Sequence, residues 1–336
     1  MSICILTNYL DKNFIDEQKI ILRSSILLNA DIYNFNDENL HFKINKKYDN
    51  VLVYFNFKVT NLKKYKDVLQ RIKIKKTFVI DTIPHIEKDV HKDILKYIEN
   101  GKIHYTLSEK NNLSLLYNLG DNFIFYDHID YNFYSTYNLK NKNTLLVLPS
   151  LQEENNFIVN KENLLSSCNS ICYNNNLYYK SGIFDGLNLI KNEKFYFNIF
   201  GSHGRDDINE ENLINYYTDN YKNIKFKGKL INKDKFYKYN LIYYGASNYD
   251  YFNYEYYTSI FKGLVPIVKE NSLFAKIIKD YKFTIKEDYS NINSVIIDLF
   301  NYNKEELYTI MQNYSNVLKK YDDNYFVSTV KGFLNG

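Results

Sequence analysis

The sequence predicts an α/β protein with two Rossmann-like domains facing each other across a cleft, and three observations support this prediction. Short apolar runs alternate with amphipathic stretches through both halves of the chain, which is the pattern of βαβ units. A length of 336 residues with 45% hydrophobic content can fill two cores. Gly201 and Gly228 follow the apolar runs at 195–200 and 224–226, as expected where a parallel sheet holds a nucleotide.

The first half predicts a doubly wound domain in which strands and helices alternate. Its apolar runs are short, and Gly101 and Gly120 close two of its helices as C-caps. The predicted strands are Ser2–Thr7, Ala30–Phe35, Asn50–Phe55, Thr77–Ile80, Lys102–Leu107 and Asn122–Tyr126. The predicted helices are Gln18–Leu28, Asn61–Ile72, Asp89–Glu99 and Glu109–Leu119.

A polar stretch from 131 to 143 shows no alternation, and we expect the chain to cross between the domains there. Thr144–Leu148 is one more strand, which Pro149 ends. The predicted division is therefore a first domain at 1–143, a second at 144–315, and a C-terminal helix at 316–336 that returns toward the first domain.

The second half repeats the alternation. The predicted strands are Ser170–Tyr173, Phe195–Phe200, Ile224–Phe226, Leu241–Tyr244 and Val265–Val268. The predicted helices are Ile183–Ile190, Asn209–Asp219, Lys233–Tyr239 and Tyr256–Lys262, followed by a helical tail from Ser272 to about Phe333. The last helices of this tail are long enough to pack back across both domains.

Several classes of protein do not fit this sequence. The chain has no run of 18 apolar residues, and its first ten residues lack the features of a signal peptide, so we expect a cytoplasmic protein. Cys4, Cys168 and Cys172 are too few for a disulfide framework and are predicted to be buried thiols. The motifs of P-loop NTPases and of dinucleotide-dependent oxidoreductases are absent.

Four segments, in this order, resemble the GT-B-fold glycosyltransferases over most of the chain. They are Lys180-Ser-Gly182, Phe-Asn-Ile-Phe-Gly-Ser-His-Gly at 197–204, Phe-Lys-Gly-Lys-Leu at 226–230, and Glu255 ahead of Gly-Leu-Val-Pro-Ile-Val at 263–268. This resemblance implies a transferase with a nucleotide-sugar donor, the first domain binding the acceptor and the second binding the donor.

Within that fold, the chain resembles the DNA β-glucosyltransferases of T-even phages. Phe78-Val-Ile-Asp-Thr-Ile-Pro84 is similar to that family's strand ending in Asp and followed by Pro, and Leu146-Val-Leu-Pro149 to its strand between the domains. Lys180 stands where the family has Arg, and a second phosphate-binding Arg has no counterpart. This resemblance implies UDP-glucose as donor, a hydroxymethylated base in double-stranded DNA as acceptor, and the host-cell cytoplasm as location if a phage encodes the chain.

The resemblance implies roles for residues of both domains. Asp81 is the predicted general base of an inverting transfer, although it could instead only cap its own turn. Lys180 is predicted to neutralise the diphosphate, helped by backbone N–H groups near Ser181 and Gly182, with a merely solvated lysine as the alternative. A divalent ion such as Mg²⁺ or Mn²⁺ could assist, although the chain contains no Asp-x-Asp motif and its histidines match no metal-ligand spacing.

Further donor contacts are implied in the second domain. Glu255 is the candidate ribose ligand, and Thr258 or Ser259 occupies the position of the second Glu that GT-B enzymes usually have. Leu230 would offer backbone atoms to the base. Gly201 and Ser202 would allow close backbone approach to the donor, although Gly201 could serve only a tight turn.

The segment from 58 to 76 is the most basic part of the chain. It holds eight Lys or Arg residues against one acidic residue, Asp67, in a chain whose total net charge is only +4. Such a segment is usually a solvated helix face, but it could attract the phosphates of DNA next to Asp81, or an anionic membrane. The candidate DNA-binding residues are Lys63, Lys64, Lys66, Arg71, Lys73, Lys75 and Lys76.

Three functions therefore remain open at this point. The first is transfer of a sugar, expected to be glucose from UDP-glucose, to a modified base of duplex DNA. The second is a GT-B transferase acting on surface polysaccharide or lipid-linked glycan, with the basic helix resting on anionic lipid. The third is an inactive module that binds a sugar nucleotide or DNA. The sequence does not specify the oligomeric state.

Overall fold

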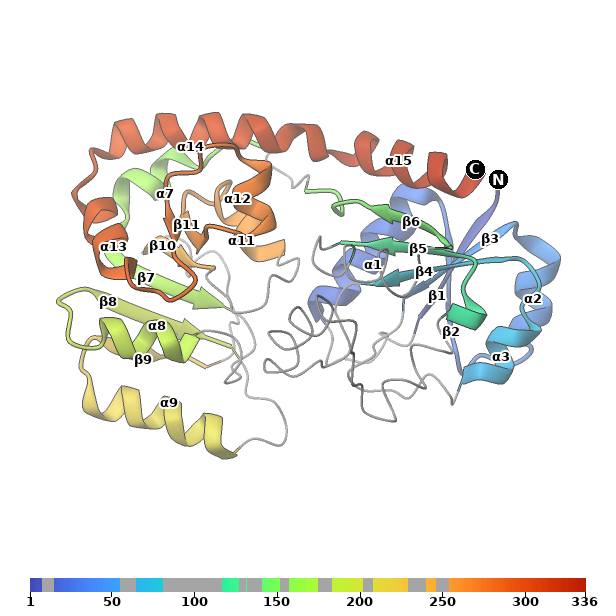
Figure 1. Cartoon of the computed structure of the whole chain (residues 1–336), viewed down its shortest axis with the longest axis horizontal. Helices are drawn as coiled ribbons and strands as arrows, with labels where there is room; N and C mark the ends of the chain where they lie inside the picture. The colour runs from blue at the N-terminus through green and yellow to red at the C-terminus, as the bar shows by residue number, and fades with distance from the viewer. Residues whose placement is uncertain are drawn as a thin grey trace. The chain divides into compact units, whose positions relative to one another are not determined.

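The computed structural model divides into two compact units, each described here by itself (Figure 1). The first unit is Met1–Ser150 with Asp323–Gly336, and the second is Leu151–Asp322. The structure describes residues 1–7, 15–54, 65–80, 117–126, 131, 141–151, 157–174, 183–201, 208–228, 240–245 and 254–336.

The first unit is built on a six-stranded sheet in the order β2-β1-β3-β4-β5-β6, in which every described pair of neighbours is parallel. Its inner strands are apolar runs because helices cover both faces of such a sheet. The strands are β1 (Ile3–Thr7), β2 (Asp31–Asn34), β3 (Asn50–Tyr54), β4 (Lys75–Ile80), β5 (Asn122–Phe125) and β6 (Asn143–Leu146).

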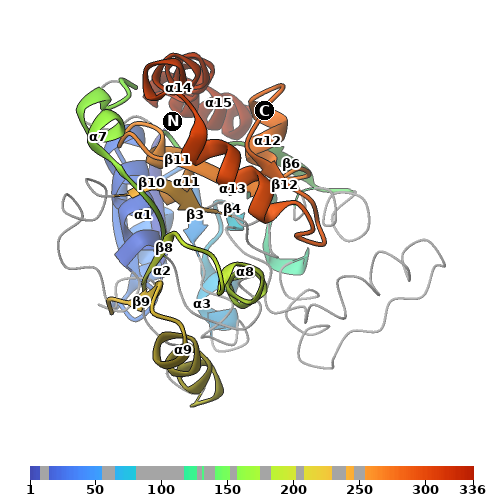
Figure 2. The same cartoon turned by 90° about the vertical axis from the view of Figure 1, so that its left-hand side faces the viewer.

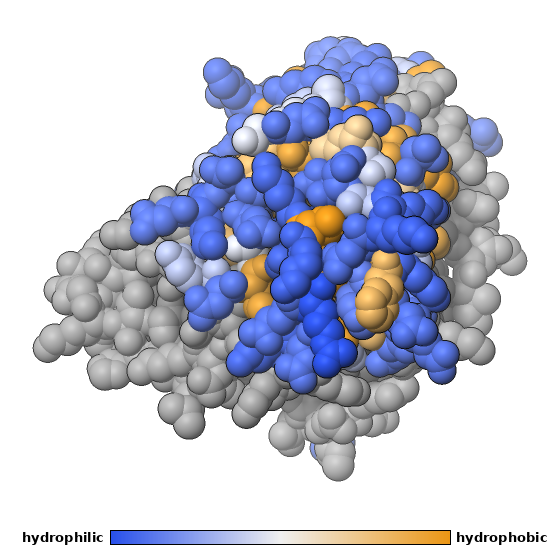
Figure 3. All heavy atoms as spheres, turned by 90° about the vertical axis from the view of Figure 1, so that its right-hand side faces the viewer, coloured by the Kyte–Doolittle hydropathy of each residue, from blue (hydrophilic) through white to orange (hydrophobic). Residues whose placement is uncertain are grey.

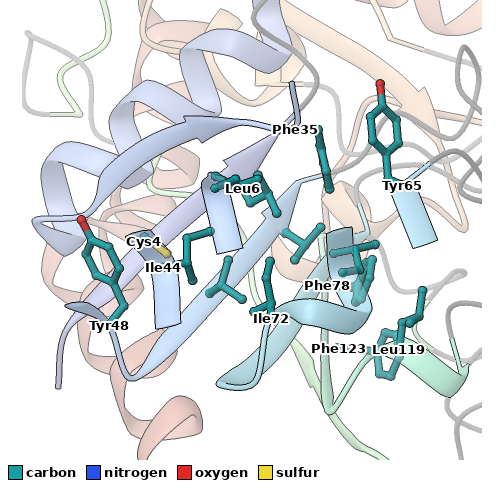
Figure 4. Close-up of a cluster of buried hydrophobic side chains, with 14 of the residues drawn as sticks. Cys4, Leu6, Phe35, Ile44, Tyr48, Tyr65, Ile72, Phe78, Leu119 and Phe123 are labelled. Carbon is teal, nitrogen blue, oxygen red and sulfur yellow. The ribbon is translucent and has the colours of Figure 1, made fainter. Parts of the chain in front are cut away.

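The helices of this unit with given bounds are α1 (Ile15–Leu28), α2 (Leu40–Lys47), α3 (Lys66–Arg71) and α15 (Asp323–Asn335), and residues 117–119 are also helical. Helix α2 was not expected from the sequence, because its residues are mostly polar. Leu40 and Ile44 lie one helical turn apart, and both are buried against the sheet. Figure 4 shows this core, in which side chains of β1, α2, α3, β4 and β5 pack together.

The second unit is built on a six-stranded sheet in the order β12-β11-β10-β7-β8-β9, again parallel at every described pair. In chain order this is the 3-2-1-4-5-6 arrangement of dinucleotide-binding folds, with its topological switch point between β7 and β10. The strands are β7 (Cys168–Asn174), β8 (Tyr196–Phe200), β9 (Ile224–Phe226), β10 (Asn240–Tyr244), β11 (Val265–Lys269) and β12 (Thr284–Ile285).

Helices connect these strands, and α8 lies beside α13 while α14 runs along α7 (Figure 2). Strand β12 corrects the predicted continuous helical tail from Ser272, because it pairs with β11 through Val268↔Thr284 and Lys269↔Ile285. The helices are α7 (Lys161–Ser166), α8 (Ile183–Ile190), α9 (Ile208–Asn220), α11 (Tyr254–Ser259), α12 (Leu273–Ile277), α13 (Ile292–Asn301) and α14 (Lys304–Leu318), followed by a 3₁₀ turn at Lys319–Tyr321.

The boundary between the units falls after Ser150, whereas the polar stretch in the sequence predicted a boundary after residue 143. The reason is that β6 pairs with β5 and so completes the first sheet. The chain returns to the first unit at Asp323, whose Oδ1 lies 2.7 Å from Arg23 of α1 and accepts a hydrogen bond from Ser150. The C-terminal segment of the first unit therefore begins at 323 and not at 316.

Some predicted elements lie outside the described residues. They are the helices Asp89–Glu99 and Lys233–Tyr239, the strand Lys102–Leu107, and the parts of the helices Asn61–Ile72 and Glu109–Leu119 that precede 65 and 117.

Gly263 is fixed by both its backbone and its surroundings. It ends the turn after α11 with a φ of 81°, and a Cβ there would lie 2.5 Å from the Asn160 carbonyl oxygen and 3.0 Å from the Leu164 nitrogen. The left-handed backbone conformation disfavours other residues, and the neighbouring backbone leaves no room for a side chain.

We expect Gly263→Ala to lower the free energy of unfolding of the second unit by about 2 kcal/mol or more, because strain and a clash add. Urea unfolding followed by circular dichroism measures this. The matched control is Gly332→Ala, in α15, where a Cβ meets nothing within 4 Å. It should raise stability by about 0.5–1 kcal/mol, as alanine usually does within a helix. Equal stability of Gly263→Ala and wild type would contradict the structure of this turn.

Candidate functional site

The carboxyl end of the second sheet, where its strands lead into their following loops, is the best candidate for a ligand site. Strands β7 and β10 are neighbours there, but their connections run in opposite directions, toward β8 and toward β11. Ligands of open α/β sheets bind in the crevice at such a switch point. The ends of the two strands are tied together, since Tyr243 of β10 donates a hydrogen bond to the Asn174 carbonyl of β7 at 3.0 Å.

Two glycines follow the neighbouring strands at this end of the sheet. Gly201 follows β8 with a φ of 147°, and Gly228 lies just beyond β9 with a φ of 71°. The N–H of Gly201 donates to the Gly228 carbonyl at 3.1 Å, which joins the two turns. Both positions therefore need the conformational freedom of glycine, as the sequence predicts for backbone that approaches a ligand closely.

Helix α8 begins just after the predicted diphosphate-binding segment and packs closely on the sheet. A Cβ on Gly186 would lie 2.7 Å from Cζ of Tyr244, so glycine is what lets the helix approach this strand. Burial, followed by the charges of neighbouring groups including Asp185 of α8, raises the pKa of Tyr244 well above its ordinary value. The Tyr244 side chain is therefore a neutral support for the first turns of α8.

Lys269 is a charged residue at this end of the sheet that the sequence analysis missed. It is the last residue of β11, and its side chain is only 10% exposed. Its Nζ lies 3.2 Å from Oε2 of Glu287 and 4.6 Å from the ring centroid of Tyr289. The sequence signal for this residue was a lysine directly after the apolar run Val-Pro-Ile-Val. Lysine is so frequent in this chain that the signal did not distinguish Lys269 from the others.

Thr258 and Ser259 are buried residues at the end of α11. Glu255 belongs to the same helix, but its side chain lies outside the described part of the structure. A contact between the ribose and Thr258 or Ser259 stays a prediction, and it would have to reach side chains that are packed into the interior of the unit.

Several predicted site residues lie outside the described residues altogether. They are Asp81, Lys180, Ser181, Gly182, Ser202 and Leu230, together with Lys63 and Lys64 of the basic segment. In the sequence, Asp81 directly follows β4, and the segment with Lys180 joins β7 to α8.

Four residues of the basic segment lie at or just before the amino end of β4 in the first sheet. Lys75 and Lys76 begin β4, whereas Asp81 follows its last residue. A strand rises about 3.3 Å per residue, so the ends of β4 are roughly 16 Å apart. Arg71 ends α3 and Lys73 lies in the turn before β4. That these four residues hold phosphates of DNA stays a prediction. Lys66 lies at the other end of α3, as its first residue.

The ammonium group of Lys76 has partners within the first unit. Its Nζ donates to the carbonyls of Ile72 and Ile74 at 3.1 and 3.4 Å, and lies 3.6 Å from Asp121 Oδ2. The face of the first unit that carries α2 and α3 is mainly hydrophilic, with separate hydrophobic side chains (Figure 3). This arrangement fits a solvated face, the alternative that the charge pattern left open.

No group of three or more His, Cys, Asp or Glu side chains that could hold a metal ion occurs among the described residues. No helix in the described part of the chain is long and apolar enough to cross a membrane. The prediction of three buried thiols is wrong for Cys168, which is exposed near the amino end of the second sheet, whereas Cys4 and Cys172 are buried.

No protein-family model and no curated protein matches the sequence. Solved structures do match the fold. HepE from Anabaena in complex with UDP-glucose aligns over 100% of both chains with a TM-score of 0.70 and 10% identity. The fold is that of the GT-B glycosyltransferases.

Two further structures support this assignment. A UDP-forming α,α-trehalose-phosphate synthase from Burkholderia xenovorans aligns with 97% of this chain and 80% of its own, at a TM-score of 0.62 and 7% identity. The pneumococcal O-GlcNAc transferase GtfA, in complex with UDP and GlcNAc, aligns with 85% of this chain and 56% of its own, at 0.54 and 15%. These matches confirm the predicted fold class, but they do not support the narrower resemblance to phage DNA β-glucosyltransferases.

The three thiols should differ sharply in reactivity. Burial, with a smaller contribution from Asp31, raises the pKa of Cys4 to about 12, so this thiol stays protonated at pH 8. We expect iodoacetamide at pH 8 to modify Cys168 in the native protein and to spare Cys4 and Cys172, as intact-mass analysis would show. All three should react in denaturant. Modification of Cys4 as fast as that of Cys168 would contradict the described core.

Proposed function

We propose that the protein is a glycosyltransferase that uses a UDP-sugar donor. The observation that carries this proposal is the alignment of the whole chain, at a TM-score of 0.70, with a structure that holds UDP-glucose. The switch point between β7 and β10 agrees with it, because this is where an open parallel sheet binds a nucleotide.

The donor would lie at the carboxyl end of the second sheet. Lys180 and the N–H groups near Ser181 and Gly182 would hold its diphosphate, and Gly201 would let the backbone approach it. Leu230 would contact the base and Glu255 the ribose. UDP-glucose is the simplest choice of donor, since HepE was crystallised with it.

The reaction forms a bond between an acceptor hydroxyl oxygen and the anomeric carbon of the sugar. The bond from that carbon to the diphosphate breaks, and UDP leaves with the electron pair. Asp81 would accept the proton of the acceptor hydroxyl, which is the role that its place after β4 and the family resemblance suggest. In this scheme the attack occurs from the face opposite to UDP and inverts the anomeric configuration.

A carbohydrate or lipid-linked glycan is the acceptor that we propose, in preference to a base of DNA. The trehalose-phosphate synthase and the O-GlcNAc transferase are named for products or sugars of carbohydrate chemistry. The basic segment that motivated a DNA acceptor lies, in its described part, mainly at the amino end of β4. A glycan acceptor does not require salt-dependent binding of phosphates beside the proposed base.

The proposal is tested by offering UDP-sugars together with glycans, lipid-linked glycan, hydroxymethylated DNA and unmodified DNA, and measuring the mass of each acceptor. We expect a gain of one sugar on a glycan. A gain on hydroxymethylated DNA alone would overturn the acceptor. Failure of the protein to bind UDP and every UDP-sugar would overturn the donor and the enzyme class together.

Asp81→Asn should lower the rate of transfer at least about 100-fold and leave the dissociation constant for the donor unchanged, because it removes only the proton acceptor. Transfer is measured as release of UDP, and donor binding by calorimetry. The control is Asp67→Asn, an exposed residue of α3, which should behave as wild type. Full activity of Asp81→Asn would leave this residue as a turn cap, and loss of donor binding would give it a different role.

A further inference from the structure

Lys269 is a cation that the proposed mechanism does not yet use. It ends β11, one strand from the switch point, and it is 8% exposed as a residue. A lysine so little exposed needs a strong reason to be there, because removing its charge from water is costly unless the charge is paired.

Its surroundings form a cluster that we call the Lys269 cluster, made of Lys269, Asn271, Glu287 and Tyr289. The Lys269 Nζ donates to Glu287 Oε2 at 3.2 Å and to the Glu287 carbonyl at 3.4 Å, and it lies over the Tyr289 ring. Asn271 Nδ2 donates to the other carboxylate oxygen, Oε1, at 3.4 Å. The Glu287 side chain is 53% exposed, so the counter-ion of Lys269 lies on the solvent side.

The cluster also lies close to the start of α8. Tyr289 is buried with a φ of 60°, and burial followed by the charges of Asp185 and Glu287 raises its pKa. Asp185 belongs to the first turn of α8. Tyr289 therefore lies within electrostatic reach of both Lys269 and the helix that follows the predicted diphosphate-binding segment.

The chemistry of the proposed reaction needs more positive charge than the sequence assigned to it. The UDP leaving group gains negative charge as its bond to the sugar breaks, and cations or metal ions stabilise such charge. Lys180 is the one cationic side chain among the predicted donor ligands. A second cation at the same end of the sheet would complete the site.

We propose that Lys269 binds the diphosphate of the donor and that Glu287 is its counter-ion in the empty enzyme. This inference rests on the proposed function and deepens it. Donor binding exchanges one anion for another. The ammonium group leaves the Glu287 carboxylate for a phosphate oxygen, and the Glu287 side chain rotates into the solvent. Tyr289 stays beneath the ammonium group and keeps it at the carboxyl end of β11.

The exchange explains why the partner is an exposed glutamate. A carboxylate that is about half in water loses little when it is released, whereas the Lys269 ammonium group, only 10% exposed, would lose its counter-ion in a poorly solvated place. The site thus remains neutral when it is empty and becomes available to a ligand of higher charge.

The test uses two substitutions with opposite expected effects, measured by calorimetric titration with UDP. Lys269→Met keeps the length of the side chain but removes its charge, and it should weaken UDP binding about ten-fold or more. Glu287→Gln removes the competing anion and should strengthen UDP binding several-fold. Lys269→Arg should retain most of the affinity, because it retains the charge.

Matched controls come from another ion pair of the same unit, Lys161 with Glu305, whose charged atoms are 2.9 Å apart on α7 and α14. Lys161→Met and Glu305→Gln should leave UDP affinity unchanged. If Lys269→Met fails to fold, Glu287→Gln and Lys269→Arg still decide the matter, since the first alters an exposed side chain and the second keeps the charge.

The outcomes separate this inference from the proposed function. If wild type binds UDP but Lys269→Met binds it equally well, the inference is wrong and the proposed function stands. If Glu287→Gln weakens UDP binding as Lys269→Met does, the pair is structural and the inference is again wrong. If wild type binds neither UDP nor UDP-sugars, both fail.

Discussion

The parallel orientation of the strands is the constraint on which the rest of this molecule depends. In each sheet every described strand points the same way as its neighbours, so the loops after the strands gather at one end and those before them at the other. In the second sheet the chain runs from β7 toward β8 and from β10 toward β11, in opposite directions. Neither connection therefore passes over the carboxyl end of the other strand. The position of the proposed donor site follows from this topology before any side chain is considered.

The two ends of the sheets differ in chemistry as well as in topology. At the amino end of the second sheet, Asn240 Oδ1 accepts hydrogen bonds from Ser170 and Asn198 at 3.0 and 2.9 Å, and in the first sheet Asn143 donates to Asn122 at 3.3 Å. These polar groups satisfy one another across neighbouring strands, so they stabilise the sheets and leave little for a ligand. The carboxyl end instead carries turns whose glycines permit close approach.

Much of this fold could be predicted from the sequence because buried parallel strands are continuous apolar runs. Strand β9 (Ile224–Phe226) and helix α8 (Ile183–Ile190) have the predicted bounds. Helix α2 was missed because only Leu40 and Ile44 of its eight residues are buried. Strand β12 was missed because it has only two residues, which form a strand by pairing with β11. Such elements are set by tertiary contacts that local sequence does not contain.

The candidate site was less predictable, since it depends on what surrounds each charge. In a chain with 43 Lys and Arg residues, a run of basic residues indicates a positive electrostatic potential. It does not indicate at which end of a sheet those residues lie. The basic segment at 58–76 is an example: its last residues, Lys75 and Lys76, begin β4, and Asp81 follows the other end of the same strand. Charge density along the sequence therefore does not indicate which end of a sheet the cations occupy, and it overlooked an isolated cation, Lys269.

Partners, more than burial, distinguish a structural lysine from one that can bind a ligand. Lys304 donates to the carbonyl of Ser167, and its pKa is lowered by burial; a carbonyl fixed in the backbone cannot be exchanged for a ligand. Lys76 has similar carbonyl partners, and its counter-ion Asp121 is itself held by the backbone N–H of Lys76 at 2.8 Å. Lys269 also donates to one backbone carbonyl, that of Glu287 at 3.4 Å, but its counter-ion is the exposed side-chain carboxylate of Glu287. An ion pair of that kind holds the lysine in place and leaves it able to bind a ligand. A phosphate can replace the carboxylate, and the released glutamate side chain is then hydrated again.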